Sequence, residues 1–455
     1  MDELRHLLSR TTELALDHLE VGGDAPISRP VDTDDLVAAL GGPLPDLASD
    51  PLTVIDLLAR VVPPGLVRTN AGRYFGFVEG GVLPAALAAD WLTSAYDQNP
   101  AFFALSPAAA AVEEVCAGWL LDMLGLPATA SVGFTTGAQM ANLVGLAVAR
   151  GQVLRRAGWD VDADGLFGAP EVTVVVGEER HATIGRALRF LGLGERRVTV
   201  LPADDQGRLR TDGLQAALAG GPAVVCAQAG NVNTGATDPL REICTIAREL
   251  GAWVHVDGAF GMWAAASPAH RHLVEGLELA DSWATDAHKW LNVPYDSGIV
   301  ACADAEAHRT AMTLSAAYLA RAGGRDGSDW TPESSRRARA FAIWAALRSL
   351  GRGGVAELVQ RSCDLTRRFV DRLAGEADVQ VLNDVVLNQA LISVGDDERI
   401  RAVAAAVQRE GVTWLGTTTW RGVGARRISV SDHATTEGDI DMAADAVRRA
   451  IHATA

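Results

Sequence analysis

The sequence predicts an α/β fold with a mostly parallel sheet in a large lobe, a helical N-terminal arm and a smaller α+β C-terminal lobe. A chain of 455 residues is too long for one simple core. Short β-branched runs alternate with helical patterns from about Gly72, and the pattern becomes mainly helical after about Leu314. We therefore expect an arm over residues 1–71, a large domain over 72–314, and a mobile loop with a small domain over 315–455.

The arm begins with an amphipathic pattern. Leucines recur at helical spacing between Asp2 and Glu20, and Asp2 is a suitable helix cap. Segments rich in proline and glycine around 22–30 and 41–51 then interrupt regular structure. This pattern predicts one helix followed by an irregular connection.

The large lobe is expected to hold strands covered by helices on both faces. Strands are predicted at 172–176, 198–201, 223–227, 253–257 and 298–302, and helices at 138–150, 184–191 and 239–250. In the C-terminal lobe, helices are predicted at 336–350 and 355–377, and strands at 379–382, 389–393 and 427–430. Because ligands bind at the carboxyl ends of parallel strands, we expect the chemistry in the loops that follow them.

Composition excludes several classes of function. A formal net charge of -17 argues against a nucleic-acid surface, which needs clustered positive charge. The first residues carry acid where a secretory signal carries base, and no segment has the apolar length of a membrane span. The five cysteines lack metal or redox spacing, so we expect reduced core thiols, no metal site and a cytoplasmic protein.

The chain contains a single lysine, Lys289, although lysine and arginine together number 40. An amine can lose its proton and attack a carbonyl group, whereas a guanidinium group stays charged. A composition bias toward arginine is the ordinary explanation, but it leaves the retained Lys289 unexplained. Because Lys289 follows His288 among apolar and aromatic residues, we interpret it as a candidate for covalent chemistry.

A carboxylate ends the predicted strand at 253–257. At the carboxyl edge of the sheet, Asp257 could pair with a protonated pyridine nitrogen, and the small Ala259 could lie flat against a ring. The commoner fate of an aspartate at a strand end is to cap a helix or turn.

Two further segments precede Asp257. The Thr-Thr-Gly-Ala stretch before the helix at 138–150 offers free backbone N–H groups and a helix dipole to a phosphate, although any capped helix has a similar appearance. His181 follows a predicted strand and could stack on a ring or act as a general acid. A solitary loop histidine more often has no special role.

The order of these segments resembles the group II pyridoxal-phosphate (PLP)-dependent decarboxylases, the family of aromatic amino acid and glutamate decarboxylases. The chain presents a phosphate turn, a loop histidine, a strand-end aspartate and then a His-Lys pair. The resemblance runs from about Gly72 to the C-terminus and is strongest over 229–239, 255–257 and 286–290. The segment 330–337, which leads to Trp344, also matches.

The resemblance implies the fold-type I PLP-dependent transferase fold with a seven-stranded sheet, and a homodimer that the N-terminal arm wraps and whose two active sites lie at the subunit interface. Lys289 would bind PLP covalently, Asp257 would pair with its ring nitrogen and His181 would stack on the ring. The cofactor-binding residues implied are Gly137, Ala138, Gln139, Asn231, Asp257, Ala259, His288 and Lys289.

The resemblance also suggests substrate contacts. Tyr74, Phe75 and Phe77 match an aromatic wall, and Phe103 matches a residue that reaches the pocket from the partner subunit. Arg427 resembles an arginine that binds a carboxylate, and Tyr318 lies at the base of the mobile loop.

Several positions depart from the family's pattern. Met140 replaces a usual Glu, and Val232 replaces a Thr whose cofactor contact Asn231 or Asn233 could supply. Asp286 replaces an Asn, and because a carboxylate would repel the phosphate we expect its side chain to point away from it. Gly327 stands where the family has a loop Tyr thought to protonate the substrate carbon, and Tyr318 is a possible substitute.

The leading hypothesis is decarboxylation of an L-amino acid to its amine and carbon dioxide. The aromatic wall and the lack of a second lysine favour an aromatic or apolar substrate, while the arginines leave an acidic substrate as an alternative. Gly327 leaves open other PLP reactions, namely aldehyde synthesis, aldol-type cleavage or transamination. A third hypothesis is a PLP-fold protein that binds the cofactor without catalysis. None of these hypotheses involves nucleic acid or a membrane.

Overall fold

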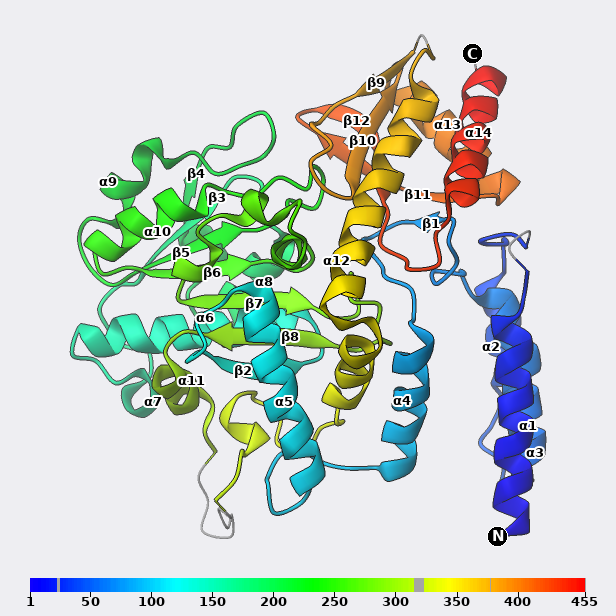
Figure 1. Ribbon diagram of the computed structural model, residues 1–455, viewed down its shortest axis with the longest axis horizontal. Helices are drawn as coiled ribbons and strands as arrows, with labels where there is room; N and C mark the ends of the chain where they lie inside the picture. The colour runs from blue at the N-terminus through cyan, green and yellow to red at the C-terminus, as the bar shows by residue number, and fades with distance from the viewer. Residues whose placement is uncertain (23–24, 315–322, 377, 455) are drawn as a thin grey trace.

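The computed structural model describes residues 1–22, 25–314, 323–376 and 378–454. The predicted α/β fold is confirmed, with two sheets and helices around them (Figure 1). The helices are α1 (Asp2–Leu19), α2 (Thr33–Leu40), α3 (Pro51–Val61), α4 (Pro84–Tyr96), α5 (Pro107–Leu124), α6 (Ala138–Arg156), α7 (Val161–Asp164), α8 (Ala182–Phe190), α9 (Leu214–Leu218), α10 (Leu240–Glu249), α11 (Ala305–Met312), α12 (Ala340–Leu373), α13 (Asp397–Glu410) and α14 (Glu437–Ala453).

The larger sheet has seven strands in the order β2-β8-β7-β6-β5-β3-β4. All neighbouring pairs are parallel except those of β8, which runs antiparallel to β2 and to β7. The strands are β2 (Ser131–Thr135), β3 (Thr173–Gly177), β4 (Thr199–Leu201), β5 (Ala223–Gln228), β6 (Trp253–Asp257), β7 (Ser282–Asp286) and β8 (Gly298–Cys302). The carboxyl ends of six strands therefore meet at one edge.

Alternation along the strands builds two apolar cores, one on each face of this sheet. In β3, Val174 and Val176 pack with α6 and α8 on one face, whereas Val175 packs with α10 and α5 on the other. Because side chains in a strand point alternately to opposite faces, both faces of each central strand are apolar. This is the covered, mostly parallel sheet that the sequence predicts.

The strands β2, at one edge of the seven-stranded sheet, and β7, inside it, are not predicted by the apolar pattern. Both are buried over their whole length, yet they carry Ser, Thr and Asp side chains. The Ser282 hydroxyl satisfies this polarity internally, because it accepts a hydrogen bond from Trp253 Nε1 at 2.9 Å and lies 2.8 Å from His255 Nδ1. Buried polar groups with partners in the core remove the alternation on which strand prediction depends.

The second sheet combines a short N-terminal strand with the C-terminal part of the chain. Its order is β1-β11-β12-β10-β9, and its strands are β1 (Tyr74–Phe75), β9 (Val379–Val381), β10 (Gln389–Val394), β11 (Trp414–Trp420) and β12 (Val423–Ser429). The predicted domain division places β1 with the large domain, but β1 pairs with β11 in the second sheet. The two helices predicted at 336–350 and 355–377 correspond to the two parts of α12, which is interrupted by a kink at Gly351, where φ is 61°.

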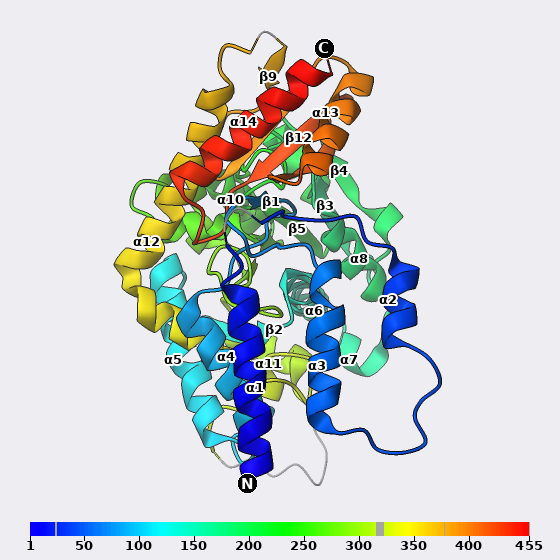
Figure 2. The same ribbon diagram turned by 90° about the vertical axis from the view of Figure 1, so that its right-hand side faces the viewer.

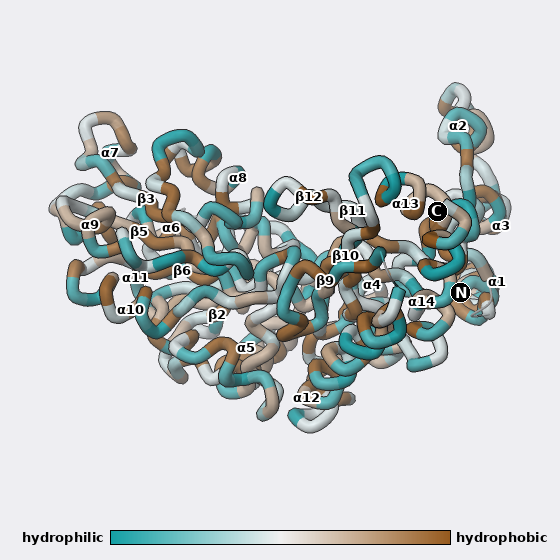
Figure 3. Tube along the Cα trace, turned by 90° about the horizontal axis from the view of Figure 1, so that it is seen from above, coloured by the Kyte–Doolittle hydropathy of each residue, from teal (hydrophilic) through white to brown (hydrophobic). Residues whose placement is uncertain are grey.

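The helices α1, α2 and α3 stand beside the body of the protein, and none of their residues is buried (Figure 2). Seen from above, they lie at the end of the molecule opposite α7 and α9, with the second sheet between (Figure 3). Their leucines remain in contact with solvent, including Leu8 and Leu58. Across the described residues, no helix combines the length and apolar character that crossing a bilayer requires.

A buried carboxamide, that of Asn292, joins the two sheets. Its Oδ1 accepts hydrogen bonds from the N–H groups of Gly81 at 2.7 Å and His433 at 2.8 Å. Its Nδ2 donates to the carbonyl oxygens of Trp290 and Ser431. Asn292 adopts a φ of 56° and is fully buried, so two distant segments are fixed to the loop that follows β7.

A second buried polar cluster anchors the segment after residue 322. The side chains of Glu113 and Arg336 are each 1% exposed, and they form an ion pair at 2.7 Å. Arg325 also pairs with Glu113 at 3.3 Å and donates to the carbonyl oxygen of Val132. The Arg325 guanidinium lies 5.2 Å from the ring centre of Trp330. One carboxylate on α5 therefore holds two cations that flank this segment.

Replacing this carboxylate tests how much it stabilises the fold. Because Glu113→Gln leaves two buried guanidinium groups without a counter-charge, it is expected to lower the free energy of unfolding by about 3 kcal/mol. Urea unfolding followed by tryptophan fluorescence measures the change. The control is Glu306→Gln, whose carboxylate is 79% exposed and pairs with Arg309, and whose effect should be much smaller. Equal effects of the two variants would contradict this account.

Candidate functional site

The start of α6 lies at the carboxyl edge of the seven-stranded sheet. Gly137 is the N-cap residue and supplies no side-chain hydrogen bond to the helix. A Cβ atom at this position would lie 3.2 Å from His288 Cε1 and 3.3 Å from Asp286 Oδ1. The glycine therefore leaves the first N–H groups of α6, beginning with that of Ala138, open to groups from the loop after β7.

The expectation that the side chain of Asp286 points away from this helix is wrong. Asp286 Oδ1 accepts a hydrogen bond from the Ala138 N–H at 2.6 Å, and the side chain is 3% exposed. Asp286 ends β7 and pairs with Gly298 of β8, so the sheet directs its carboxylate to this place. A carboxylate is a favourable partner for the positive end of a helix, and this attraction directs the Asp286 side chain toward α6.

Lys289 reaches the same place from the loop. Its Nζ atom lies 3.0 Å from Asp286 Oδ2, and its side chain is 20% exposed. His288 Nε2 lies 3.4 Å from Asp286 Oδ1, while His288 Nδ1 accepts a hydrogen bond from the Ser297 N–H at 3.1 Å. The neutral His288 ring therefore carries its proton on the nitrogen that faces Asp286. Burial lowers the pKa of His288, which keeps this ring neutral near pH 7.

Asp257 and His181 meet through Thr183. The Thr183 hydroxyl lies 2.8 Å from His181 Nδ1 and donates to Asp257 Oδ2 at 3.5 Å. Asp257 Oδ1 accepts a hydrogen bond from the Ala259 N–H at 3.2 Å, and Ala259 is partly exposed at the end of the strand. His181 caps α8, because its Nδ1 accepts from the Thr183 N–H. Thr183 is a member of this site that the sequence did not identify, although it stands two residues after His181.

A chain of buried hydrogen bonds supports Thr183 from within the sheet. Asn142 Nδ2 donates to the Thr183 hydroxyl at 3.3 Å, and Asn142 Oδ1 lies 2.9 Å from His255 Nε2. His255 Nδ1 lies 2.8 Å from the Ser282 hydroxyl. Burial lowers the pKa of His255 to about 3, so this histidine is a neutral link. The chain fixes the position of Thr183 and, through it, of His181 and Asp257.

Electrostatic interactions connect His181 and Asp257 with Lys289 and Arg427. Burial lowers the pKa of His181, and among the charged groups Asp257 acts first to raise it. The charges of Lys289 and Arg427 lower the same pKa, so both cations lie within electrostatic reach of the imidazole. Asp257, Lys289 and Arg427 therefore all act electrostatically on His181 at the carboxyl edge of the sheet. Arg427 is itself held by a hydrogen bond from Nη1 to the carbonyl oxygen of Val232 at 3.1 Å.

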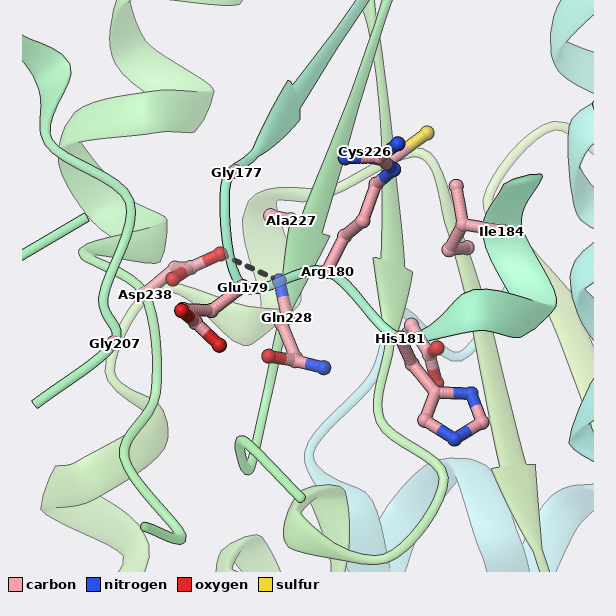
Figure 4. A pocket seen from close by; sticks show the side chains of 11 residues that line it. Gly177, Glu179, Arg180, His181, Ile184, Gly207, Cys226, Ala227, Gln228 and Asp238 are labelled. Carbon is pink, nitrogen blue, oxygen red and sulfur yellow. Dashed lines mark hydrogen bonds between the residues drawn. The ribbon is translucent and has the colours of Figure 1, made fainter. Parts of the chain in front are cut away.

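A small cavity lies behind His181 and Asp257 (Figure 4). Arg180 and His181 lie on one side of it, and Gln228 and Asp238 lie on the other. Its space of about 10 Å³ suits roughly one water molecule rather than a ligand. Burial raises the pKa of Asp238 to about 6, although this carboxylate accepts hydrogen bonds from the N–H groups of Gln228 and Leu209. This cavity supports the site but does not form a substrate pocket.

Of the three residues of the predicted aromatic wall, Tyr74 and Phe75 are buried and Phe77 is exposed, and a role of the wall in substrate binding stays a prediction. Phe77 and Val78 adopt φ angles of 49° and 60°, which non-glycine residues rarely adopt. Phe77 is 63% exposed, and its ring centre lies 5.3 Å from that of Trp414. Tyr74 stacks on the other part of Trp414 at 5.1 Å. Such strain is typical of functional positions, and here it presents an aromatic ring to solvent.

Asn231, Phe103 and Tyr318 are three further residues of the predicted site, and their outcomes differ. Asn231 is 1% exposed, and its side chain bonds to Gln228 Oε1, to the carbonyl oxygen of Glu179 and to two N–H groups of its own turn. This arrangement shapes the turn, and a cofactor contact of Asn231 stays a prediction. Phe103 is held by the segment after residue 322, because its N–H donates to Asp326 Oδ1 at 2.8 Å. Tyr318 lies outside the described residues.

Gly327 is enclosed by its neighbours. A Cβ atom there would collide with the carbonyl oxygen of Pro100 and with the Arg336 guanidinium. The family's loop tyrosine therefore cannot occupy this position in the present packing.

The residues present fit PLP. The start of α6 lacks a side-chain cap of its own, and Gln139 Oε1 next to it is a buried acceptor without a partner. The Lys289 amine lies beside Asp286, and it acts electrostatically on the half-buried His181 imidazole together with the strand-end Asp257. PLP needs a phosphate cradle, an amine and an acid for its ring nitrogen, and these groups supply all three. Within the described part of the chain, no cluster of His, Cys, Asp or Glu side chains could hold a metal ion.

Comparisons with known proteins also indicate PLP-dependent decarboxylation. The family model described as "Pyridoxal-dependent decarboxylase conserved domain" matches residues 37–392. The aromatic-L-amino-acid decarboxylase of Bacillus atrophaeus is 26% identical over 85% of this chain and 80% of its own length. The 4-hydroxyphenylacetaldehyde synthase of Rhodiola rosea is 27% identical over 82% of this chain and 79% of its own length.

A solved structure supports the fold. The crystal structure of Oryza sativa TDC with PLP and tryptamine superposes with a TM-score of 0.93 at 23% identity, covering 100% of this chain and 98% of that chain. The fold is therefore fold type I, as the sequence predicts.

The charge of Asp257 predicts the direction in which the pKa of His181 shifts when this charge is removed. Because Asp257 raises the pKa of His181 while burial lowers it, Asp257→Asn should lower this pKa further. Histidine-selective NMR titration of the cofactor-free protein measures the shift, with His181 assigned from a His181→Gln spectrum. The control Glu376→Gln removes a carboxylate that lies 2.9 Å from His452, and it should leave the His181 pKa unchanged. An increase in the His181 pKa in Asp257→Asn would contradict the assignment.

Proposed function

This chain belongs to the pyridoxal-dependent decarboxylase family and is a PLP-dependent carboxy-lyase, and we propose that Lys289, Asp257 and His181 form its catalytic site. One observation carries this proposal. The only lysine of the chain lies at the carboxyl edge of the sheet, in electrostatic reach of His181, which Thr183 joins to Asp257.

Each residue of the proposed site has a role that follows from its surroundings. When bound, PLP supplies an aldehyde that reacts with amines and a ring that withdraws electrons from the bond being broken. The amine of Lys289 would bind the cofactor and exchange with the amino group of the substrate. Asp257, with hydrogen bonds from Ala259 and Thr183, would hold a proton at the ring nitrogen. The N–H groups at the start of α6 would bind the phosphate.

His181 is proposed to lie over the ring of the cofactor. Its Nδ1 accepts from the Thr183 N–H, so the neutral imidazole carries its proton on Nε2. Because burial favours this neutral form, Nε2 can donate a hydrogen bond without adding a positive charge to the site.

The substrate is proposed to be an aromatic L-amino acid. Phe77 presents an exposed ring beside Trp414, which offers apolar and stacking contacts to an aromatic side chain. Arg427 is proposed to bind the substrate carboxylate, since its Nε is a buried donor without a partner near His181. The relative from Bacillus atrophaeus is named as an aromatic-L-amino-acid decarboxylase, which agrees with this choice.

A second candidate function is aldehyde synthesis, and Gly327 is the observation that favours it. No side chain fits at this position, so the chain lacks the phenol that the family usually places there. In this reaction an amino acid, dioxygen and water give an aldehyde, carbon dioxide, ammonia and hydrogen peroxide. A relative named as an aldehyde synthase supports keeping this alternative.

The proposed assembly is a homodimer with shared active sites, in which residues 1–71 form an arm on the partner, 72–314 the large domain and 315–455 the loop and small domain. The arm has no buried residue in one chain, so its leucines are free to pack on a second copy. Phe103 is proposed to reach the partner's pocket, because the segment after residue 322 fixes it away from Lys289.

We further propose a cytoplasmic location, since all five cysteines are buried and free.

Product analysis with a panel of amino acids tests the reaction. We expect carbon dioxide and the amine in equal amounts, without ammonia, and fastest with aromatic substrates. The control Lys289→Arg keeps a cation beside Asp286 but cannot bind an aldehyde, so it should lose the yellow colour of the cofactor and at least about a thousandfold in kcat. Carbon dioxide with ammonia and peroxide would instead identify aldehyde synthesis. Ammonia without carbon dioxide would refute both.

The aromatic wall gives a separate prediction. Phe77→Ala should raise KM for an aromatic amino acid about three- to tenfold and change kcat less, because the ring contributes stacking rather than chemistry. Steady-state kinetics measure both constants. Phe167→Ala is the matched control, since Phe167 is 98% exposed and lies outside the site. A KM equal to that of the parent would show that Phe77 does not touch the substrate.

A further inference from the structure

The carboxylate of Asp286 occupies a donor that the phosphate of PLP would use. The Ala138 N–H is the first N–H of α6, and it donates to Asp286 Oδ1 at 2.6 Å. The backbone of Asp286 is fixed, because the last residue of β7 is paired with Gly298, whose backbone packs closely against that of Gly137. A phosphate bound at the start of α6 would therefore lie in contact with the Asp286 carboxyl group.

The groups around Asp286 offer little positive charge to share. On its own loop, Lys289 Nζ lies 3.0 Å from Oδ2, and the neutral His288 lies 3.4 Å from Oδ1. On α6 it faces the positive end of the helix, and its charge acts on His181, the residue before α8. On the remaining side, the Tyr295 ring lies against the His288 ring, and burial and the charges of Glu79 and Asp286 raise the pKa of Tyr295. Within the described residues, Lys289 is the one cation that an ion pair joins to Asp286.

Binding of PLP changes this balance of charge. The phosphate brings up to two negative charges to the start of α6, and the amine of Lys289 is then committed to the cofactor. Two acids that share one site do not both stay ionised, because each charge raises the proton affinity of the other group. The His288 ring next to them is neutral, so it contributes a hydrogen bond rather than a charge.

We propose that Asp286 takes up one proton when the phosphate of PLP binds at the start of α6, so that its neutral carboxyl group donates a hydrogen bond to the phosphate. In the absence of cofactor, the charged Asp286 caps α6 and holds Lys289 in place. Cofactor binding is therefore coupled to proton uptake, and the affinity for PLP falls as the pH rises. This inference rests on the proposed function, because it assumes that PLP binds with its phosphate at α6.

Isothermal titration calorimetry in two buffers of different ionisation enthalpy measures the protons taken up when PLP binds. Near pH 8, the parent protein should take up about one proton more than Asp286→Asn. The Asn side chain can accept from the Ala138 N–H and donate to the phosphate without any proton uptake. Asp286→Asn should therefore bind PLP at least about tenfold more tightly at this pH, with a difference that grows about tenfold for each pH unit.

Two controls test whether the extra proton depends on the phosphate of PLP and on the position of the carboxylate at Asp286. Pyridoxal reacts with Lys289 but carries no phosphate, so the extra proton should disappear when it replaces PLP. Asp296→Asn removes a carboxylate from the same loop that is 43% exposed and paired with Arg339, and it should leave the proton count of the parent unchanged. Phosphorus-31 NMR of bound PLP should report a dianion at pH 8, which places the proton on Asp286 rather than on the phosphate.

Equal proton counts for the parent and Asp286→Asn, weaker PLP binding by Asp286→Asn, or a monoanionic bound phosphate would overturn the inference. Should Asp286→Asn fail to fold, the parent protein alone decides, because its proton counts with PLP and with pyridoxal must differ by about one. A parent protein that binds no PLP at all would instead refute the proposed function.

Discussion

The five hydrogen bonds of the Asn292 side chain hold the loop that carries Lys289 between the two sheets. They join this loop to residues 80–81, which follow the aromatic wall, and to residues 431–433, which follow β12. The packing is close enough that a Cβ atom at Gly80 would collide with the carbonyl oxygen of Lys289. The position of the amine relative to Phe77 and Arg427 therefore depends on one buried carboxamide, and the site lies where the two lobes meet.

Two carboxylates end neighbouring parallel strands, and their surroundings separate their roles. The strands β6 and β7 lie side by side, so Asp257 and Asp286 meet at one edge of the sheet. Neutral donors, the Thr183 hydroxyl and the Ala259 N–H, bind Asp257 and leave it free to face a cationic ring. A helix end and an ammonium group bind Asp286, which ties it to Lys289 and to the phosphate cradle. The same residue type thus serves two chemistries, because the partners differ.

The sequence predicted the parts of the fold that local pattern controls. The strands β6 and β8 have the predicted bounds, and the order of α6, α8, β6 and the Lys289 loop follows the expected succession of motifs. The predictions were incomplete at β2, β7 and β11, where buried polar side chains or half-exposed threonines replace apolar alternation. They were wrong for Asp286, because repulsion from a phosphate was considered without the attraction of a helix end and an amine.

Long-range contacts account for the site residues that local pattern did not reveal. Asn292 and Gly81 are separated by 211 positions, and the pattern around either residue contains no sign of the other. The bond between Asn142 and His255 spans 113 positions, so a polar residue in a helix and one in a strand become partners only after the sheet forms. Thr183 is closer to detection, since a threonine after a helix-capping histidine is a local feature, but its contact with Asp257 is 74 positions away.

The packing of the segment after residue 322 limits which of its side chains can take part in the reaction. Gly327 has no room for a side chain, and Trp330 is held between Arg325 and Arg309. Asp326 uses its carboxylate to hold the Phe103 backbone, and the buried carboxylate of Glu113 holds the cations on either side. These side chains serve the structure of the segment, so they are not available to the substrate in this arrangement. A proton donor supplied by this loop must therefore come from residues before 323, or else the donor lies on the sheet edge, where His181 already stands.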